Sequence, residues 1–257
     1  MTALILTYHA VEDGPAPLCF SPKAFRAHLD AIAEAEAEVI TVSEMAAALH
    51  DSDLPDRAVA ITFDDGFRSV VEHAAPMLHA RSLPATVFAV AGHLGGENDW
   101  PTQPKRAPRR PLASAEDLTE LVAEGWEIGC HGLRHAPLSG ASPGTLDKEL
   151  IDARRDLAQA TGTEVRAFAF PYGALPGADG RDILAHHYAA ACTTDLGRVR
   201  SDSDVLALPR VETHYVRRPD LLRRAIDGTL DTYLGARRRL ARARRVLRRD
   251  YVAGGKS

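Results

Sequence analysis

The sequence predicts an α/β fold in which helices connect the strands of a parallel sheet. Short apolar runs alternate with longer amphipathic patterns along the chain, as expected for successive βα units. The length of 257 residues is ordinary for one α/β barrel, and the 45% apolar content is enough for a large core. Because neither an internal repeat nor a linker interrupts the pattern, we expect one main domain over residues 1–228 and a basic tail over residues 229–257.

The predicted strands are short runs rich in β-branched and aromatic residues. The clearest is Val59-Ala60-Ile61-Thr62-Phe63, which is followed by two aspartates and the turn-forming Gly66. The complete set of expected strands covers residues 3–8, 39–42, 58–63, 85–90, 127–130, 167–170, 189–193 and 205–208.

The predicted helices begin at capping residues. Ser21 is an N-cap with Pro22 in the first turn, and Ser114 with Asp117 forms a capping box. One expected helix starts at residues 21–22. The others cover residues 43–49, 67–79, 114–124 and 142–161, and the tail from residue 219 is expected to be helical.

Composition and charge exclude several classes of protein. The net charge of −4 gives no general attraction for nucleic acid. Three widely spaced cysteines, Cys19, Cys130 and Cys192, form no paired metal motif, so we expect free thiols. The sequence has no run approaching the roughly 20 apolar residues that span a membrane. It also shows no secretory leader at its start, and we therefore expect a cytoplasmic protein.

Two adjacent carboxylates, Asp64 and Asp65, follow the predicted strand that ends at Phe63. Neighbouring side chains of a strand point to different sides of the chain, and each buried carboxylate needs a positive partner. His131 and His135 come after another predicted strand, where one turn of helix would aim both rings at a single ion. One carboxylate and two imidazoles form a catalytic site for Zn²⁺ or a similar divalent ion such as Co²⁺ or Ni²⁺.

The same residues indicate a metal-dependent hydrolase. Only one of the two aspartates needs to bind the ion, and the other can take a proton from a water molecule that the ion acidifies. A nearby arginine would orient this base, and Arg166 is the candidate. The turn Pro171-Tyr172-Gly173 would aim a backbone N–H at a developing oxyanion.

Together these segments resemble the polysaccharide deacetylase family, also known as carbohydrate esterase family four. Residues 62–66, 131–135 and 166–173 are similar, in order and spacing, to the first three motifs of that family, and the resemblance covers about residues 1–215. It implies a distorted (β/α) barrel of about seven parallel strands. It also implies the roles of the site residues: Asp64 as the general base, Asp65, His131 and His135 as the metal ligands, and the Tyr172 amide as the oxyanion donor.

Three features depart from the family pattern. Gly132 follows the first metal-binding histidine, where the family usually has Ser or Thr, so a local hydroxyl contact is lost. Ala169 stands where the family usually has the arginine that tethers the base. Arg166 lies three positions earlier, on the opposite face of a regular strand. The usual late Leu-x-His motif, which carries the catalytic acid, has no clean copy.

The general acid has two candidates. Residues 6–9 (Leu-Thr-Tyr-His) resemble the start of the poly-N-acetylglucosamine deacetylase branch, whose barrel is similar to a circular permutation with the acid-bearing strand moved to the front. The resemblance therefore assigns His9 as the general acid that protonates the leaving amine, although a structural role at the strand end is the alternative. His214, in the poorer late match over residues 211–214, is the second candidate.

Substrate contacts are predicted from four places in the sequence. Residues 92–111 are rich in Gly and Pro and too long for a simple connection, so this loop is functional or disordered. Within it Trp100 would stack on a sugar face or cap the core, and Asp99 lies beside it. Pro171 and Asp195 follow predicted strands and would line the groove, as would His214.

The resemblance implies an enzyme that removes an N-acetyl group from an amino sugar and releases acetate. An oligosaccharide, a lipid-linked glycan or a glycosylated metabolite would suit a cytoplasmic protein. An O-acetyl esterase or another amide hydrolase would use the same residues. Two hypotheses fit less well: a glycosidase, whose carboxyls flank the bond from two sides at about 5–9.5 Å, and a carbohydrate-binding protein without activity.

The C-terminal tail contains eight arginines between Arg237 and Arg249, interspersed with Leu240, Val246 and Leu247. Such a basic amphipathic helix would lie on an anionic membrane surface as a peripheral contact. A solvated terminal helix is the alternative, and nucleic-acid binding is not expected because the chain as a whole is acidic. The sequence does not predict the oligomeric state.

Overall fold

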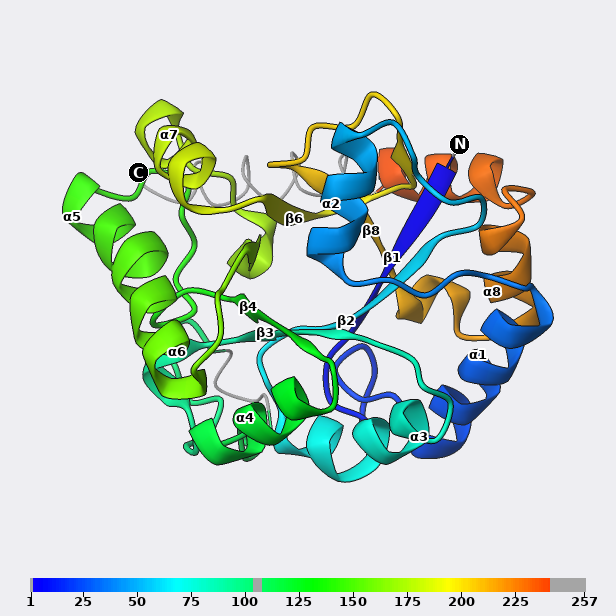
Figure 1. The fold of residues 1–257 in the computed structure, drawn as a ribbon, viewed down its shortest axis with the longest axis horizontal. Coiled ribbons are helices and arrows are strands. Elements are labelled where there is room, and N and C mark those ends of the chain that lie inside the picture. The colour runs from blue at the N-terminus through cyan, green and yellow to red at the C-terminus, as the bar shows by residue number, and fades with distance from the viewer. Residues whose placement is uncertain (1, 104–107, 241–257) are drawn as a thin grey trace, which may run out of the picture.

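The computed structural model describes residues 2–103 and 108–240, in which seven parallel strands form a closed barrel surrounded by helices (Figure 1). Each strand is parallel to the next, and the last pairs with the first. A further short strand, β7 (Val199–Arg200), is antiparallel to β1. The predicted distorted (β/α) barrel is confirmed. Its strands in spatial order are β1 (Thr2–Tyr8), β2 (Val59–Phe63), β3 (Thr86–Ala89), β4 (Glu127–Cys130), β5 (Ala167–Ala169), β6 (Ala190–Leu196) and β8 (Leu208–Glu212).

Most predicted strands are confirmed, but the one expected over residues 39–42 is wrong. Val39 forms only an isolated bridge to Val59. The Thr41 side chain accepts a hydrogen bond from the Glu44 amide while Glu44 reaches back to Thr41, and this capping box starts α2 (Val42–His50) directly afterwards. The local capping signal therefore overrides the β-branched run.

The strand predicted over residues 205–208 lies further along the chain, since β8 covers Leu208–Glu212. Pro209 explains the error because proline has no N–H to donate within a sheet and argues against a strand in the sequence. In the structure the pairing of β6 with β8 shifts register between Cys192 and Leu196, opposite this part of β8. Such an irregular stretch tolerates a proline.

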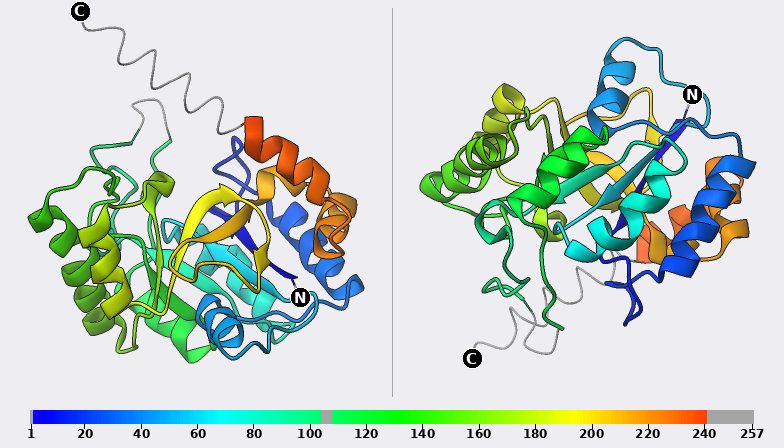
Figure 2. Two further views of the ribbon diagram at one scale, coloured as in Figure 1. Left: turned by 90° about the horizontal axis from the view of Figure 1, so that it is seen from above. Right: turned by 60° about the horizontal axis from the view of Figure 1, so that its bottom comes forward.

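Helices surround the strands on the outside of the barrel (Figures 1 and 2). The predicted caps are present: Ser21 accepts a hydrogen bond from the Ala24 amide, and Ser114 and Asp117 form a reciprocal capping box. The sequence did not predict α7, and both long predicted helices contain a π-helical turn. The helices are α1 (Pro22–Glu34), η1 (Val70–Ala74), α3 (Ala75–His79), α4 (Ala115–Ala123), α5 (Pro143–Leu146), η3 (Asp147–Asp152), α6 (Ala153–Thr161), α7 (Ala178–His187) and α8 (Pro219–Ile226), with short 3₁₀ turns η2 (Ala91–His93), η4 (Pro171–Gly173) and η5 (Thr213–Val216).

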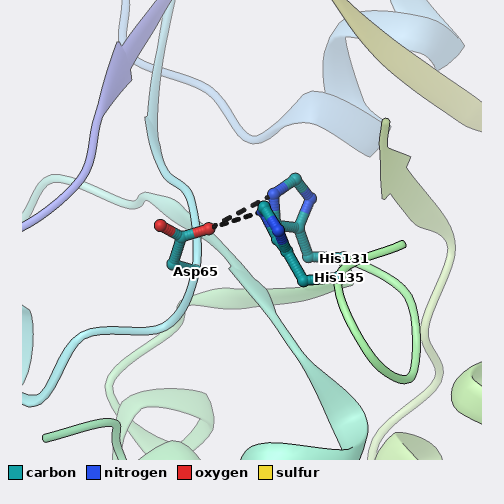
Figure 3. Close-up of side chains that lie close together, drawn as sticks. All are labelled: Asp65, His131 and His135. Atoms are coloured by element: carbon teal, nitrogen blue, oxygen red, sulfur yellow. Dashed lines mark ion pairs between the residues drawn. The ribbon is translucent and has the colours of Figure 1, made fainter. Parts of the chain in front are cut away.

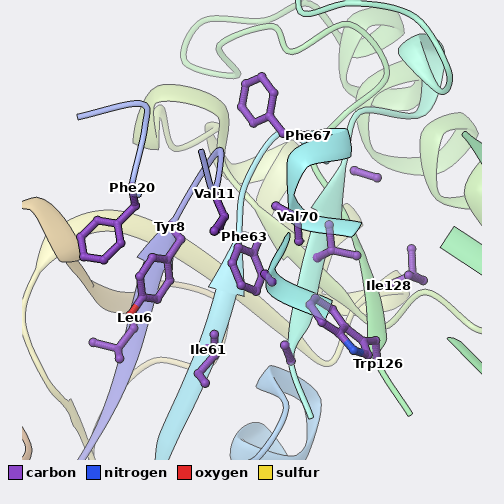
Figure 4. Close-up of a cluster of buried hydrophobic side chains, with 14 of the residues drawn as sticks. Leu6, Tyr8, Val11, Phe20, Ile61, Phe63, Phe67, Val70, Trp126 and Ile128 are labelled. Carbon is purple, nitrogen blue, oxygen red and sulfur yellow. The ribbon is translucent and has the colours of Figure 1, made fainter. Parts of the chain in front are cut away.

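Large side chains face the helices, and small ones fill the inside of the barrel. Leu6 and Tyr8 of β1 and Ile61 and Phe63 of β2 belong to the large outer cluster (Figure 4). The alternate positions, including Ala60, form a separate inner cluster rich in alanine. Each fully buried large side chain contributes about 1.5–3 kcal/mol, so most of the stabilisation comes from the outer layer. All three cysteines are buried and free, as predicted.

The amino end of the barrel is closed by α2. The Glu127 carboxylate at the start of β4 accepts hydrogen bonds from the Val42 amide at 3.0 Å and from the Thr86 hydroxyl at 2.7 Å. Met45 and Ala46 of the same helix belong to the inner cluster. In barrels of this kind the active site lies at the opposite, carboxyl end of the strands.

The described part of the tail lies against the barrel domain. Leu230 and Leu234 are buried in the core, and residues 231–240 are helical. Most of the basic stretch predicted over residues 237–249 lies outside the described residues, so the membrane contact stays a prediction. Among the described residues, no helix combines the length and apolar character needed to cross a bilayer.

His28 provides a pH test of how α1 packs on the barrel. Its ring is fully buried, with Nδ1 2.7 Å from the Tyr8 hydroxyl and Nε2 3.1 Å from the Arg217 carbonyl oxygen. Burial lowers the pKa of His28 to about 4, whereas the unfolded chain has a value near 6.5. The unfolded chain therefore binds the extra proton first as the pH falls. We expect the free energy of unfolding to decrease by about 3 kcal/mol between these two pKa values.

Chemical denaturation across this pH range measures the decrease. The control His28→Gln keeps a donor and an acceptor but does not titrate, so its unfolding free energy should fall less steeply than that of the wild type. Equal slopes for the two proteins would contradict the assignment.

Candidate active site

The carboxyl ends of the barrel strands surround a pocket of about 200 Å³. Its walls come from residues that directly follow the strands or end them, including His9 after β1, Asp64 after β2, His131 after β4 and Glu212 at the end of β8. Parallel strands bring their carboxyl ends to one edge, and this gathers residues that are far apart in the sequence.

Asp65, His131 and His135 form a compact group in this pocket (Figure 3). Asp65 Oδ1 lies 3.4 Å from His131 Nε2 and 3.2 Å from His135 Nε2. One ligand atom from each residue lies within 4.8 Å of the others, and all three side chains are buried. The structure thus brings together the three residues predicted as metal ligands.

The backbone reaches this arrangement differently from the sequence prediction. We expected Asp64 and Asp65 to point to different sides of the chain, but both line the same pocket. Asp65 lies beyond the end of β2 and has φ 71°, a left-handed conformation that redirects its side chain. The helical turn expected between His131 and His135 is also wrong: the segment is a loop, and His135 has φ 54°.

The three side chains fit a divalent cation. His131 Nδ1 donates to the Ala169 carbonyl oxygen at 2.8 Å, which leaves the lone pair of Nε2 directed at Asp65. Burial lowers the pKa of His135 below its usual value, which favours the neutral ring that a cation needs. Asp65 Oδ1 is buried and accepts no hydrogen bond from any described residue. Such an oxygen is costly unless a cation binds it.

Both aspartates are ionised despite their burial. Burial raises the pKa of Asp65, but the hydrogen bonds and charge of the facing His131 and His135 rings outweigh it when Nε2 carries a proton, and hold the value well below the usual range. Burial likewise raises the pKa of Asp64, and the Arg210 guanidinium reverses the effect and lowers it. Arg210 Nη1 and Nη2 donate to the two Asp64 carboxylate oxygens at 2.6 and 2.7 Å. This bidentate pair holds Asp64 charged and in one orientation.

Arg210 orients Asp64, which is the role that the sequence prediction gave to Arg166. Arg166 precedes β5 and therefore lies at the amino end of the barrel, where it lines a different cavity with Ser43 and His50. Asp64 lies at the opposite end, so Arg166 cannot orient it. Arg210 was missed because the strand that carries it, β8, was placed too early in the sequence.

His9 lies in the same pocket, next to an acid that the sequence prediction also missed. Burial lowers the pKa of His9, but the negative charges of Glu212, Asp65 and Asp64 outweigh this effect and raise it. His9 Nδ1 is buried and has no hydrogen-bond partner among the described residues. Burial raises the pKa of Glu212 as well. The sequence prediction ended this strand at residue 208, so Glu212 gave no strand-end signal.

The loop over residues 92–111 holds His135 from the outside. The Trp100 ring stacks on the His135 ring, with centroids 4.3 Å apart and 26° between the planes. The Thr102 hydroxyl donates to the His135 carbonyl oxygen at 3.1 Å and accepts from the Tyr172 hydroxyl at 2.9 Å. Trp100 lines the pocket but is only 2% exposed. In this structure the ring therefore caps His135, and its contact with a sugar stays a prediction.

Of the remaining residues predicted to act at the site, only Tyr172 lines the pocket. Tyr172 is 46% exposed and has φ 58°, and the role of its amide stays a prediction. Four residues predicted to contact substrate lie outside the pocket lining: Asp99, which pairs with His93 and Arg109; Pro171, which is buried; Asp195; and His214, which is exposed.

Comparison with known proteins identifies the family. Residues 51–188 match the polysaccharide deacetylase family, which is more than half of the 257-residue chain. The chain belongs to the polysaccharide deacetylase family. The resemblance inferred from the three motifs is therefore confirmed.

Relatives of this deacetylase-family chain are distant in sequence. YxkH of Bacillus subtilis (strain 168) is 24% identical over 208 residues, which are 80% of this chain and 70% of YxkH. The poly-beta-1,6-N-acetyl-D-glucosamine N-deacetylase of Staphylococcus aureus (strain MSSA476) is 26% identical over 164 residues, which are 60% of this chain and 54% of that protein. The aligned region thus spans about half the length of the staphylococcal relative.

Solved structures of other proteins share the fold of this family member. Streptococcus pyogenes deacetylase PplD, solved in complex with acetate, has a TM-score of 0.71 and 24% identity, and the similarity covers 82% of this chain and 92% of PplD. IcaB from Ammonifex degensii has a TM-score of 0.69 and 24% identity, with 86% of this chain and 97% of that chain covered. These similarities confirm the barrel fold.

We expect that removing Arg210 from its pair with Asp64 lowers the stability of the fold strongly. Arg210→Met removes the positive partner and leaves the buried Asp64 carboxylate unpaired, which costs about 3–5 kcal/mol. Denaturant unfolding at pH 7 should therefore show a much lower midpoint for this variant, with partial recovery in Asp64→Asn/Arg210→Met. The control Arg166→Met lies at the other end of the barrel and should unfold like the wild type. Equal midpoints for Arg210→Met and Arg166→Met would refute the pairing.

Proposed function

We propose that this protein is a metal-dependent deacetylase that removes N-acetyl groups from the amino sugars of a polysaccharide and releases acetate. The observation that carries the proposal is the convergence of Asp65, His131 and His135 beside Asp64, an ionised carboxylate fixed by Arg210. Family membership supports it, as does the name of the staphylococcal relative, a poly-beta-1,6-N-acetyl-D-glucosamine N-deacetylase. An N-acetylglucosamine polymer is accordingly the proposed substrate class.

We propose Zn²⁺ as the cofactor, held by Asp65, His131 and His135. One carboxylate and two imidazoles with room left for other ligands suit a catalytic zinc site, and they also accept Co²⁺ or Ni²⁺. When bound, the cation acidifies a water molecule and polarises the acetyl carbonyl. All three cysteine thiols are buried and none belongs to the three-residue group.

Asp64 is the proposed general base. As the oxygen of water attacks the acetyl carbon, the Asp64 carboxylate takes the proton that this water loses. Arg210 keeps the carboxylate ionised and leaves it no freedom to rotate, because both oxygens accept from the guanidinium. The Tyr172 amide is the proposed donor to the carbonyl oxygen as negative charge develops there.

His9 is the proposed general acid. Breaking the bond between the acetyl carbon and nitrogen needs a proton on the departing nitrogen, because an amide anion is a very poor leaving group. His9 lines the pocket together with Asp64 and Asp65, and the negative charge around it favours the protonated ring. Among these negative charges, Glu212 raises the pKa of His9 the most.

Metal removal tests the proposal. Acetate release from a β-1,6-linked N-acetylglucosamine oligosaccharide should fall to background after dialysis against a chelator, because the ion activates both water and substrate. Added Zn²⁺ or Co²⁺ should restore the activity in the wild type but not in the control Asp65→Ala. Full activity of the metal-free protein would end the proposal. Release from O-acetylated sugars alone would favour the O-acetyl esterase alternative.

Substitution of His9 tests the proton donor separately from the metal. His9→Gln should lower kcat on an N-acetylated sugar by about 10²–10⁴-fold, the usual contribution of general acid catalysis. The loss on 4-nitrophenyl acetate should be far smaller, since its leaving group needs no proton. His214→Gln is the matched control and should retain activity because that side chain is exposed outside the pocket. Equal losses on both substrates would exclude His9 as the acid.

A further inference from the structure

Glu149 is a buried acid that the proposed chemistry does not use. It lies in the π-helical turn η3, is 3% exposed and does not line the active-site pocket. A carboxylate in such a place is costly unless it is well hydrogen-bonded. Its hydrogen-bond partners therefore indicate why it is there.

The Glu149 carboxylate binds the loop between the two histidine ligands. Its Oε2 accepts hydrogen bonds from the Leu133 amide at 2.8 Å and from the Arg134 amide at 3.1 Å. These residues lie between His131 and His135, so one oxygen fixes two consecutive peptide units of the loop. Adjacent backbone N–H groups that converge in this way form a concave binding site for an anion.

The opposite side of the same loop is fixed as well. The Ala91 amide donates to the Gly132 carbonyl oxygen at 2.9 Å, and the Gly92 amide donates to the Leu133 carbonyl oxygen at 2.9 Å. The loop is thus held between the start of η2 and Glu149. This support matters because no helix holds the segment and His135 has a left-handed backbone conformation.

Gly132 provides the space for the carboxylate. Its φ is +81°, and a Cβ atom added there would lie 2.5 Å from Glu149 Oε2. No real Cβ atom approaches an oxygen so closely, so a side chain at position 132 and the observed position of the Glu149 carboxylate exclude each other. The glycine that departs from the family pattern of Ser or Thr is therefore matched to an acid 17 positions later.

The helix that carries Glu149 has an unusual form. A π-helical turn (Asp147–Asp152) interrupts the run of α5 and α6, and Glu149 lies within it. π-Turns are rare and occur frequently at functional sites. This turn places the Glu149 carboxylate within hydrogen-bond distance of the loop between the two histidines.

We propose that Glu149 is a positioning residue for the metal site, acting through the Leu133 and Arg134 amides on the segment that joins His131 to His135, and that Gly132 is the residue that admits its carboxylate. The inference rests on the metal site of the proposed function. Glu149 touches neither the ion nor the substrate; it sets the affinity for the ion by holding both rings in place.

Metal affinity of the apo protein tests the proposal without any activity assay. Zn²⁺ is titrated into chelator-treated protein in competition with a chromophoric chelator. Glu149→Ala should weaken Zn²⁺ binding by about 10- to 100-fold, the usual effect of losing a group that orients a ligand. The matched control Asp147→Ala removes an exposed acid from the same π-helical turn and should bind Zn²⁺ like the wild type.

Glu149→Gln keeps the shape of the side chain and so remains informative if Glu149→Ala does not fold. Its neutral carbonyl makes hydrogen bonds about half as strong as those of a carboxylate, so Zn²⁺ affinity should lie between those of the wild type and Glu149→Ala. The visible absorption of the Co²⁺-loaded protein should change as well, since it reports ligand geometry. Wild-type affinity in Glu149→Gln would overturn the inference.

Gly132→Ser tests the exclusion between the two positions. In the wild-type background it should displace the carboxylate and lower Zn²⁺ affinity strongly. In the Glu149→Ala background, where nothing is left to displace, the same substitution should have a smaller effect. Equal effects in both backgrounds would mean that the two positions are independent and would contradict the proposal.

The outcomes separate this inference from the proposed function. A wild-type apo protein that binds no ion would refute the metal site itself. A wild type that binds one ion, together with Glu149→Ala that binds it equally tightly, would refute only the positioning role.

Discussion

Two adjacent carboxylates, both buried at the end of β2, impose the main constraint on this structure. Neither Asp64 nor Asp65 can stay ionised in the pocket without its own positive partner. Asp64 has the Arg210 guanidinium, and Asp65 has the imidazoles of His131 and His135 with room for a cation. In the proposed mechanism, the different partners give two chemically identical side chains two roles, one as a proton acceptor and one as a metal ligand.

The barrel brings these partners together, and the surrounding loops make the site rigid. Arg210 comes from β8 and Asp64 follows β2, and small side chains inside the barrel leave space for the pair to meet across it. His135 depends on elements outside the strands. Trp100 stacks on its ring and Thr102 donates to its carbonyl oxygen. Glu149 accepts hydrogen bonds from the Leu133 and Arg134 amides just before it. The metal site thus depends on segments that show no metal-binding motif.

The sequence predicted what periodicity and spacing encode, and missed what depends on backbone details. Apolar runs predicted most barrel strands, and the motif residues do meet in one pocket. Because Pro209 argues against a strand, β8 was predicted too early in the sequence. Arg166 was therefore predicted to be the partner of Asp64 instead of Arg210. The left-handed conformations of Asp65 and His135 leave no periodic signal, because φ above zero is set by tertiary packing at these residues.

The central claim is that Asp65, His131 and His135 bind one cation next to the Arg-paired Asp64. Anomalous diffraction at the zinc absorption edge, from crystals of the Zn²⁺-loaded protein, tests it most directly. The account predicts a single strong peak within coordination distance, about 2.0–2.2 Å, of Asp65 Oδ1 and both Nε2 atoms. A peak at other residues, or none in the pocket of fully loaded protein, would contradict it.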